Sequence, residues 1–540
     1  MPPRLHDAAL DRIQPRRADL AQALGRSWNG VLNGVNVGSP PCVYTRRGRY
    51  CMRLSRWITA GITAIAAFAV AGLALAASGP VDVSGLSPFA SCTIGGPGTN
   101  YVNSEVEPFV AVNPTNPSNI VGVFQQDRWS NGGAHGLVTS TSHDGGSTWA
   151  ESWAHFSSCS GGTAANGGDY GRASDPWVTF APSGDAYQIS LSASSDLTVS
   201  AVLVSKSIDG GDTWSEPTTL ARNVSAFPEG PGFNDKESIT ADPTNANNVY
   251  AVWDRSRFPS DRAGVTAQMN AASVRGDIMF SRTTDGGQTW ETARDILGLN
   301  QNEFTVGNQI AVLPDGTLVD IFEDLNGSGR QRSPNQFHES VIRSTDHGAT
   351  WSKVIDISTD GSIAVRDPDT GAFVRSGAGL PDIAVAPNGT LYAVWSDGRF
   401  SGFTHDDIAL SRSTDGGLTW STPIKVNASP SGVAAFTPSV DVASDGTVAV
   451  SYYDFRNNTP DPSTLPTDAF TVFSHDGGAN FGGELRLTKT SFDLDLAPHA
   501  GGLFLGDYVG LGHTGTRFVP FFTQTVSSSN PTDVFASFVP

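Results

Sequence analysis

One short motif recurs six times along the chain and constrains the fold more than any other feature of the sequence. It has the form Ser/Thr-x-Asp-x-Gly-x-Thr-Trp, and only the last copy is degenerate, ending in Asn480-Phe481. Successive motif aspartates lie 65, 76, 61, 69 and 61 residues apart. Repetition on this scale indicates a chain assembled from copies of one supersecondary unit. The motif aspartates are Asp144, Asp209, Asp285, Asp346, Asp415 and Asp476.

The residue types of the motif are those of a hairpin turn. An aspartate carboxylate can accept hydrogen bonds from backbone N–H groups of its own turn. Glycine supplies the positive φ that other residues avoid, and tryptophan offers a large apolar face to a neighbouring sheet. We therefore predict that the six motif aspartates are structural and hold six outer hairpins in place.

Short apolar segments precede each motif and have the lengths of strands. The segments 109–112, 177–180, 238–241, 309–312 and 382–385 are each followed two residues later by proline, a turn signal. The 59 Gly, 33 Pro and low charged fraction of 16% fit many short strands joined by tight turns. We predict an all-β protein whose units are four-stranded antiparallel meanders, arranged radially as a β-propeller.

The C-terminal stretch predicts one further unit that lacks the motif. Its strands are expected at 508–511, 518–521 and 534–537, and it has no fourth strand of its own. The segment 81–84 could supply that strand and close the ring. We therefore favour seven blades, with six as the alternative.

The N-terminal region is typical of an export signal. In residues 52–76, the basic segment Met52–Arg56 precedes 19 uncharged, mostly apolar residues and the small-residue cleavage site Ala74-Leu75-Ala76. The alternative is a weak membrane anchor, since the run is long enough to span a bilayer. Residues 1–51 are interpreted as a non-native or disordered extension. Residues 77–100 are assigned to a linker and the ring-closing strand, residues 101–540 to the propeller, and the protein to the secreted or cell-surface class.

Two cysteines lie in the part of the chain expected to be exported. In an oxidising compartment Cys92 and Cys159 predict one disulfide, which would tie the N-terminal strand to the loop leading into the second unit. No CxxC pair or His/Cys cluster indicates zinc, so we expect no metal and no cofactor. The net charge of −19 disfavours nucleic acid and anionic membrane surfaces as partners. The oligomeric state stays open.

The repeated motif resembles the Asp-box, or bacterial neuraminidase repeat, of the sialidase superfamily, and the resemblance covers about residues 101–540. It implies a secreted glycoside hydrolase of the exo-α-sialidase type that acts on terminal acidic sugars of glycans. The alternative is a non-catalytic propeller that binds glycans or proteins at the cell surface. A third possibility is hydrolysis of a neutral polysaccharide by paired carboxylates such as Asp235 and Asp382.

Strand order predicts which face holds the site. First strands begin and second strands end on one face, opposite the motif turns. The resemblance implies a tyrosine nucleophile, for which we select Tyr508, with Glu237 as its base and Asp175 or Asp235 as the acid. Arginines that follow second strands could grip a substrate carboxylate together, beside Asp382. The alternative is that each pairs with its neighbouring aspartate. These arginines are Arg128, Arg255, Arg399 and Arg456.

Overall fold

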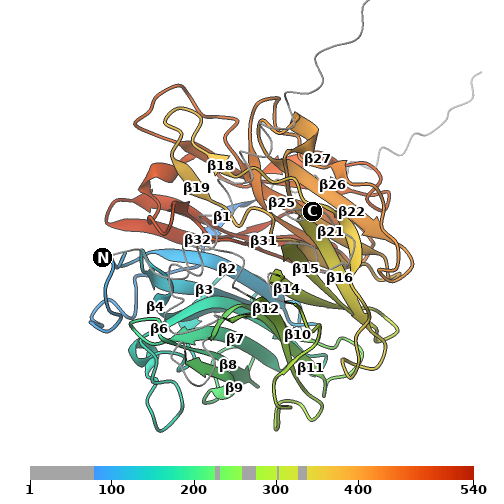
Figure 1. Ribbon diagram of the computed structural model, residues 1–540. Coiled ribbons are helices and arrows are strands. Elements are labelled where there is room, and N and C mark those ends of the chain that lie inside the picture. Colours follow the sequence, from blue (N-terminus) through green and yellow to red (C-terminus); the bar gives the residue numbers. More distant parts are fainter. Residues whose placement is uncertain (1–77, 225–231, 258–274, 301–302, 326–336) are drawn as a thin grey trace, which may run out of the picture.

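The computed structural model describes residues 78–224, 232–257, 275–300, 303–325 and 337–540, and this part of the chain is all-β, as predicted (Figure 1). Helical structure there is limited to the 3₁₀ turns η1 (Ser158–Ser160), η3 (Gly398–Ser401) and η4 (Leu494–Leu496). No helix within the described ranges is long and apolar enough to cross a membrane. The predicted extension (1–51) and export signal (52–76) lie outside the described residues.

The strands follow one antiparallel pattern that repeats along the chain. The first strands are β2 (Glu105–Val112), β6 (Arg172–Phe180), β10 (Gly232–Ala241), β14 (Phe304–Val312), β20 (Asp382–Val385), β24 (Ala435–Val442) and β30 (Gly510–Thr514). The second strands are β3 (Ile120–Arg128), β7 (Ala186–Ala193), β11 (Val249–Arg257), β15 (Leu318–Leu325), β21 (Leu391–Asp397), β25 (Val448–Asp454) and β31 (Arg517–Ser527).

The third and outer strands complete each meander. The third strands are β4 (Ala134–Ser142), β8 (Val199–Ser207), β12 (Arg275–Thr283), β16 (His338–Ser344), β22 (Asp407–Ser413), β26 (Pro466–Ser474) and β32 (Asn530–Phe538). The outer strands are β5 (Ala150–Ser152), β9 (Thr218–Val224), β13 (Arg294–Asp295), β17 (Ile355–Thr359), β23 (Ile424–Lys425) and β27 (Gly482–Arg486). A separate small sheet contains β18 (Val365–Arg366), β19 (Phe373–Arg375) and β29 (Leu503–Phe504), and β28 (Phe492–Asp493) pairs with β26.

Pairing between neighbouring meanders is sparse. One bridge, Ala134 to Ala173, joins β4 to β6 and merges the first two meanders into an eight-stranded sheet. The first strands nevertheless contact one another in chain order, β2 to β6 to β10 to β14 to β20 to β24 to β30, and β30 contacts β2 again. The order of these contacts is therefore circular, with the first strands on the inside.

The two ends of the described chain lie together. Strand β1 (Ser78–Asp82) pairs antiparallel with β32, with Val81 opposite Ala536 and Asp82 opposite Phe535 (Figure 1). The observed strand begins and ends slightly earlier than the expected segment 81–84. Cys92 and Cys159 form a disulfide with an S–S distance of 2.06 Å, which links the segment before β2 to η1.

The core lies between successive meanders. Trp177 of β6, Ile189 of β7 and Trp253 of β11 belong to one buried cluster, and Val252 of β11 and Phe322 of β15 belong to the next. Both faces of a sheet are thus covered by its neighbours. This explains why second strands such as β11 and β21 begin with five consecutive apolar or aromatic residues, 249–253 and 391–395.

The motif turns have the geometry that their residue types predict. In the first copy, Asp144 Oδ1 accepts hydrogen bonds from the N–H groups of Ser147 and Thr148, both at 2.9 Å, and Oδ2 accepts the Thr148 hydroxyl at 2.7 Å. Gly146 has a φ of 89°, and a Cβ there would lie 1.9 Å from Phe538 in the C-terminal sheet. Each turn is therefore held locally and packs against a neighbouring sheet.

Candidate functional site

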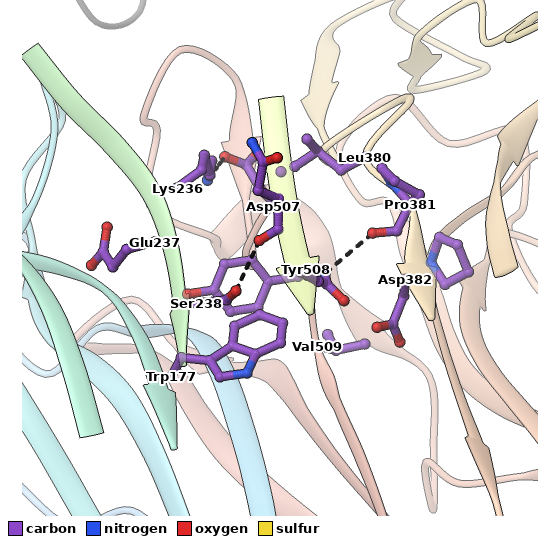
Figure 2. Close-up of a pocket in the computed structure, with 14 residues that line it drawn as sticks. Trp177, Lys236, Glu237, Ser238, Leu380, Pro381, Asp382, Asp507, Tyr508 and Val509 are labelled. Carbon is purple, nitrogen blue, oxygen red and sulfur yellow. Dashed lines mark hydrogen bonds and ion pairs between the residues drawn. The ribbon is translucent and has the colours of Figure 1, made fainter. Parts of the chain in front are cut away.

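A cavity lies at the inner ring of first strands, against the middle of β6, β10, β14 and β24 and the start of β20 (Figure 2). It encloses about 510 Å³, a volume that includes its open mouth. Side chains from five first strands or the residues just before them, together with the segment before β30, form its walls. Among its lining residues are Trp177, Glu237, Asn308, Asp382, Pro438 and Tyr508.

The first strands share a backbone irregularity at the cavity, and these positions together form the inner rim of the molecule. In β2, β6, β10, β14 and β24, two residues of the first strand oppose a single residue of the second, which defines a β-bulge. The first residue of each bulge has a positive φ, an uncommon conformation outside glycine and an outlier for a β-branched residue. Such strain clusters at functional sites. These residues are Glu107 (53°), Asp175 (51°), Lys236 (49°), Gly307 (76°) and Thr437 (51°).

Among the acidic residues that line the cavity, Glu237 is the one whose carboxyl group has no hydrogen-bond partner. Its side chain is 2% exposed, and neither carboxyl oxygen has a hydrogen-bond partner. Burial raises its pKa well above the usual range, and the charges of Asp175 and Asp235 act in the same direction. Burial thus favours the protonated form of Glu237. A buried neutral carboxyl can donate a proton, so this placement favours an acid over the predicted base.

Asp382 is the second carboxyl group of the cavity and is firmly held. Its Oδ2 accepts hydrogen bonds from the Ser439 hydroxyl and the Val440 N–H, both at 2.8 Å, and Oδ1 accepts the Ile383 N–H at 2.9 Å. Burial raises the pKa of Asp382 to about 6, against the effect of these bonds. Asp382 is thus mostly ionised at neutral pH. Figure 2 shows it across the cavity from Glu237, with Tyr508 between them.

A buried ion cluster lies beside the cavity. The Lys236 ammonium is 2.7 Å from Asp507 Oδ2, 3.2 Å from Glu107 Oε1 and 3.7 Å from Asp175 Oδ2. Arg375 binds Asp507 in a bidentate manner, at 3.0 Å and 2.7 Å. Burial opposes ionisation of Asp507, but Arg375 and Lys236 hold its pKa well below the usual range. Both cations of the cluster are therefore committed to carboxylates.

The cluster accounts for four residues that sequence reasoning placed differently or missed. Asp175, predicted as a catalytic acid, binds Lys236 and does not line the cavity. Asp235 accepts the Lys236 N–H at 3.1 Å and does not line the cavity either. Lys236 and Arg375 were not predicted, because a single lysine or arginine in a strand carries no local signal.

Tyr508 forms a wall between the two acids. Its hydroxyl donates a hydrogen bond to the Pro176 carbonyl at 3.0 Å, and its ring lies 5.3 Å from that of Trp177. Burial and the charge of Glu107 raise its pKa well above the usual range. A nucleophilic tyrosine needs a base that accepts its proton, and here the hydroxyl is held by a backbone carbonyl. This placement does not fit the predicted nucleophile.

None of the four predicted arginines lines this cavity, and each guanidinium has a partner on its own part of the fold. For Arg399 and Arg456 the alternative interpretation holds, since both bind the neighbouring aspartate at 2.6 Å. The other two use different partners. Arg255 binds Asp277 at 2.7 Å, and buried Arg128 donates to Gln125 Oε1 at 2.7 Å. Extended guanidinium groups are satisfied by the first carboxylate or amide within reach.

Comparisons with known sequences give short matches. No family model matches the chain. It is 28% identical over 188 residues to xyloglucanase Xgh74A of Acetivibrio thermocellus, a match that covers 34% of this chain and 19% of that protein. It is 25% identical over 228 residues to a xyloglucanase of a Paenibacillus species, covering 41% and 18%. The matches thus span about a fifth of the length of these curated relatives.

Solved structures that resemble this chain at low similarity include carbohydrate-active proteins. The GH93 α-L-arabinofuranosidase of Fusarium graminearum, bound to arabinobiose, has a TM-score of 0.43 and 16% identity, covering 70% of this chain and 92% of that one. The sialidase NanB of Streptococcus pneumoniae has a TM-score of 0.42 and 11% identity, covering 82% and 94%. Both TM-scores lie below 0.5.

Proposed function

We propose that this protein is a glycoside hydrolase in which Glu237 is the general acid and Asp382 the general base. One observation carries the proposal: a single cavity holds Glu237, a buried carboxyl without a hydrogen-bond partner, opposite Asp382, a carboxyl anchored by three donors. Hydrolysis of a glycosidic bond requires this division between two carboxyl groups. Burial separates their protonation states, as in other acid–base pairs.

In the proposed reaction, Glu237 donates its proton to the glycosidic oxygen as the bond from that oxygen to the anomeric carbon breaks. A water molecule forms the new bond to the anomeric carbon and gives a proton to Asp382. The products are a reducing sugar and an alcohol, and the proton then returns from Asp382 to Glu237 through solvent. The Ser439 and Val440 donors orient Asp382 for this step.

The charges of the cavity favour a neutral sugar. Its acidic lining residues are Glu237, Asp382 and Asp507, and its cationic lining residue, Lys236, is committed to carboxylates. A sugar carboxylate would find no uncommitted cation among the described lining residues. This supports the third possibility raised by the sequence, with Glu237 in place of Asp235, over an exo-sialidase. The xyloglucanase relatives make xyloglucan the first polysaccharide to test.

We add two proposals, one about the fold and one about localisation. We propose that the meanders are seven four-stranded blades of a propeller closed by β1 on β32, supported by the circular order of contacts between first strands. We also propose that the protein is exported, supported by the Cys92–Cys159 disulfide, since such bonds persist mainly in oxidising compartments.

The test is an activity assay of the full chain with matched variants. We expect release of reducing sugar from xyloglucan or arabinan, no cleavage of 4-methylumbelliferyl α-sialoside, and a loss of roughly 10²–10⁴-fold in Glu237→Gln. Asp320→Asn is the control, because Asp320 is also a fully buried carboxyl with a raised pKa but lies outside the cavity lining.

Full activity in Glu237→Gln, or cleavage of the sialoside alone, would contradict the neutral-sugar hydrolase. Glycan binding without turnover by the wild-type protein would favour the non-catalytic alternative instead. Equal losses in Asp320→Asn and Glu237→Gln would attribute the effect to folding rather than to the cavity.

A further inference from the structure

The second residue of the bulge differs between first strands, although the bulge geometry is the same. The second residue of the bulge is proline in β2, β6 and β24, and proline also precedes Asp382 in the equivalent segment. Proline suits this position because the bulge leaves a residue outside the ladder, where no N–H is needed. The departures from proline at this bulge position are Glu237 and Asn308, and both line the cavity.

Asn308 lies in the next sheet at the same bulge position as Glu237. Its side chain is 1% exposed, and its Nδ2 donates to Asp254 Oδ1 at 2.6 Å. Asp254 also accepts the Gly307 N–H at 2.9 Å and the Thr305 hydroxyl at 2.9 Å. The amide of Asn308 is therefore anchored through its nitrogen.

The oxygen of the same amide is left without a partner. Asn308 Oδ1 is buried and accepts no hydrogen bond, whereas the backbone carbonyl of Asn308 accepts the Ser238 hydroxyl at 2.9 Å. An unsatisfied buried acceptor costs free energy that an incoming donor recovers. The site thus holds a fixed, unused acceptor at the wall that also presents the Glu237 carboxyl.

We propose that Asn308 is a substrate-binding residue whose Oδ1 accepts a hydrogen bond from a ring hydroxyl of a neutral sugar. The inference rests on the proposed function and deepens it by naming the group that recognises the substrate. A fixed acceptor discriminates strongly against a sugar that lacks the matching hydroxyl, because the acceptor is then buried unpaired. The Trp177 and Tyr508 rings supply the apolar wall of the same cavity.

The repeat supplies a matched substitution for the test. Asn308→Pro restores the residue that three other bulges carry, so the backbone is expected to tolerate it, and Asn308→Ala is the second variant if it does not. Binding is measured by calorimetry in the Glu237→Gln background with xyloglucan oligosaccharides and with arabinobiose. We expect Kd to rise at least tenfold for the sugar that binds. Tm should fall by only a few degrees, because Asp254 loses the Asn308 donor but keeps the Gly307 and Thr305 donors. In the active protein, KM should rise more than kcat falls.

A Kd within twofold of the Glu237→Gln parent for both variants would overturn the role of Asn308, and so would failure of both sugars to bind that parent. The two proposals fail separately. If Glu237→Gln keeps full turnover while Asn308→Pro weakens binding, the acid assignment falls and the Asn308 subsite stands. If Glu237→Gln is inactive and Asn308→Pro binds normally, the reverse holds.

Discussion

Aspartates in the motif turns and aspartates at the cavity have pKa values shifted in opposite directions. In the motif turns, Asp285 accepts three hydrogen bonds, from the Thr289 N–H, the Thr289 hydroxyl and the Thr283 hydroxyl, and these lower its pKa to about 2. On the inner rim, Asp382 also accepts three, yet burial raises its pKa to about 6. The number of donors is equal, so access to solvent decides the sign.

The motif turns and the inner rim also differ in how far their contacts reach along the chain. A motif aspartate bonds to groups within four residues of itself, as Asp285 does to Thr289. Lys236 on the inner rim contacts Asp507, 271 residues away, and Glu107, 129 residues away. The turns are six similar local devices, whereas the inner rim is one assembly of several first strands. This difference predicts unequal costs of substitution.

The largest loss in the free energy of unfolding is expected for a substitution of Asp507. Asp507→Asn leaves Lys236 and Arg375 buried with one fewer negative charge, and breaking a buried ion pair in this way typically costs about 3–5 kcal/mol. Urea unfolding monitored by tryptophan fluorescence measures the change. A loss below about 1 kcal/mol would mean that the cluster is not the non-local clamp described above.

A substitution in a motif turn should lower the free energy of unfolding by a smaller amount and leave activity unchanged. Thr283→Ala removes a hydroxyl that accepts the Gly287 N–H and donates to Asp285, with an expected loss of about 1 kcal/mol. Thr283→Ser, which introduces the residue of the five other copies, should restore stability. Because the pKa of Asp285 is lowered, the contribution of its ionised form is present above about pH 4 and is lost as pH falls towards 2.

Unfolding curves at pH 7 and pH 3 test this dependence, and the difference between wild type and Thr283→Ala should shrink at the lower pH. If Thr283→Ala lost hydrolysis while its stability was unchanged, the motif turn would affect the cavity directly. That result would contradict the separation between structural turns and the inner rim.

The smallest expected effect is a shift in a pH profile. The Ser439 hydroxyl stabilises the ionised form of Asp382, so Ser439→Ala should raise the pKa of that group above about 6. Since the proposed base must be ionised, activity falls as pH drops through this pKa. The acidic limb of kcat/KM should therefore move to higher pH, by up to about one unit. An unmoved limb would assign that limb to another group.

Sequence reasoning located the site better than it assigned roles. Strand ends pointed to Glu237, Asp382 and Tyr508, and all three line one cavity. Asn308 could have been found by aligning the bulge position across repeats, where proline is the usual residue. No comparable signal exists for Arg375, which reaches the cluster from the small sheet of β18, β19 and β29.

The sequence by itself determined the local features of this protein, namely the all-β class and the turn chemistry of the six motifs. Each depends on residues a few positions apart, whose backbone preferences and hydrogen bonds are set by their own chemistry. Only the tertiary structure decided which carboxyl groups are ionised and where the arginines bind. Charge states depend on burial and on partners hundreds of residues away, and neither is encoded in any single segment.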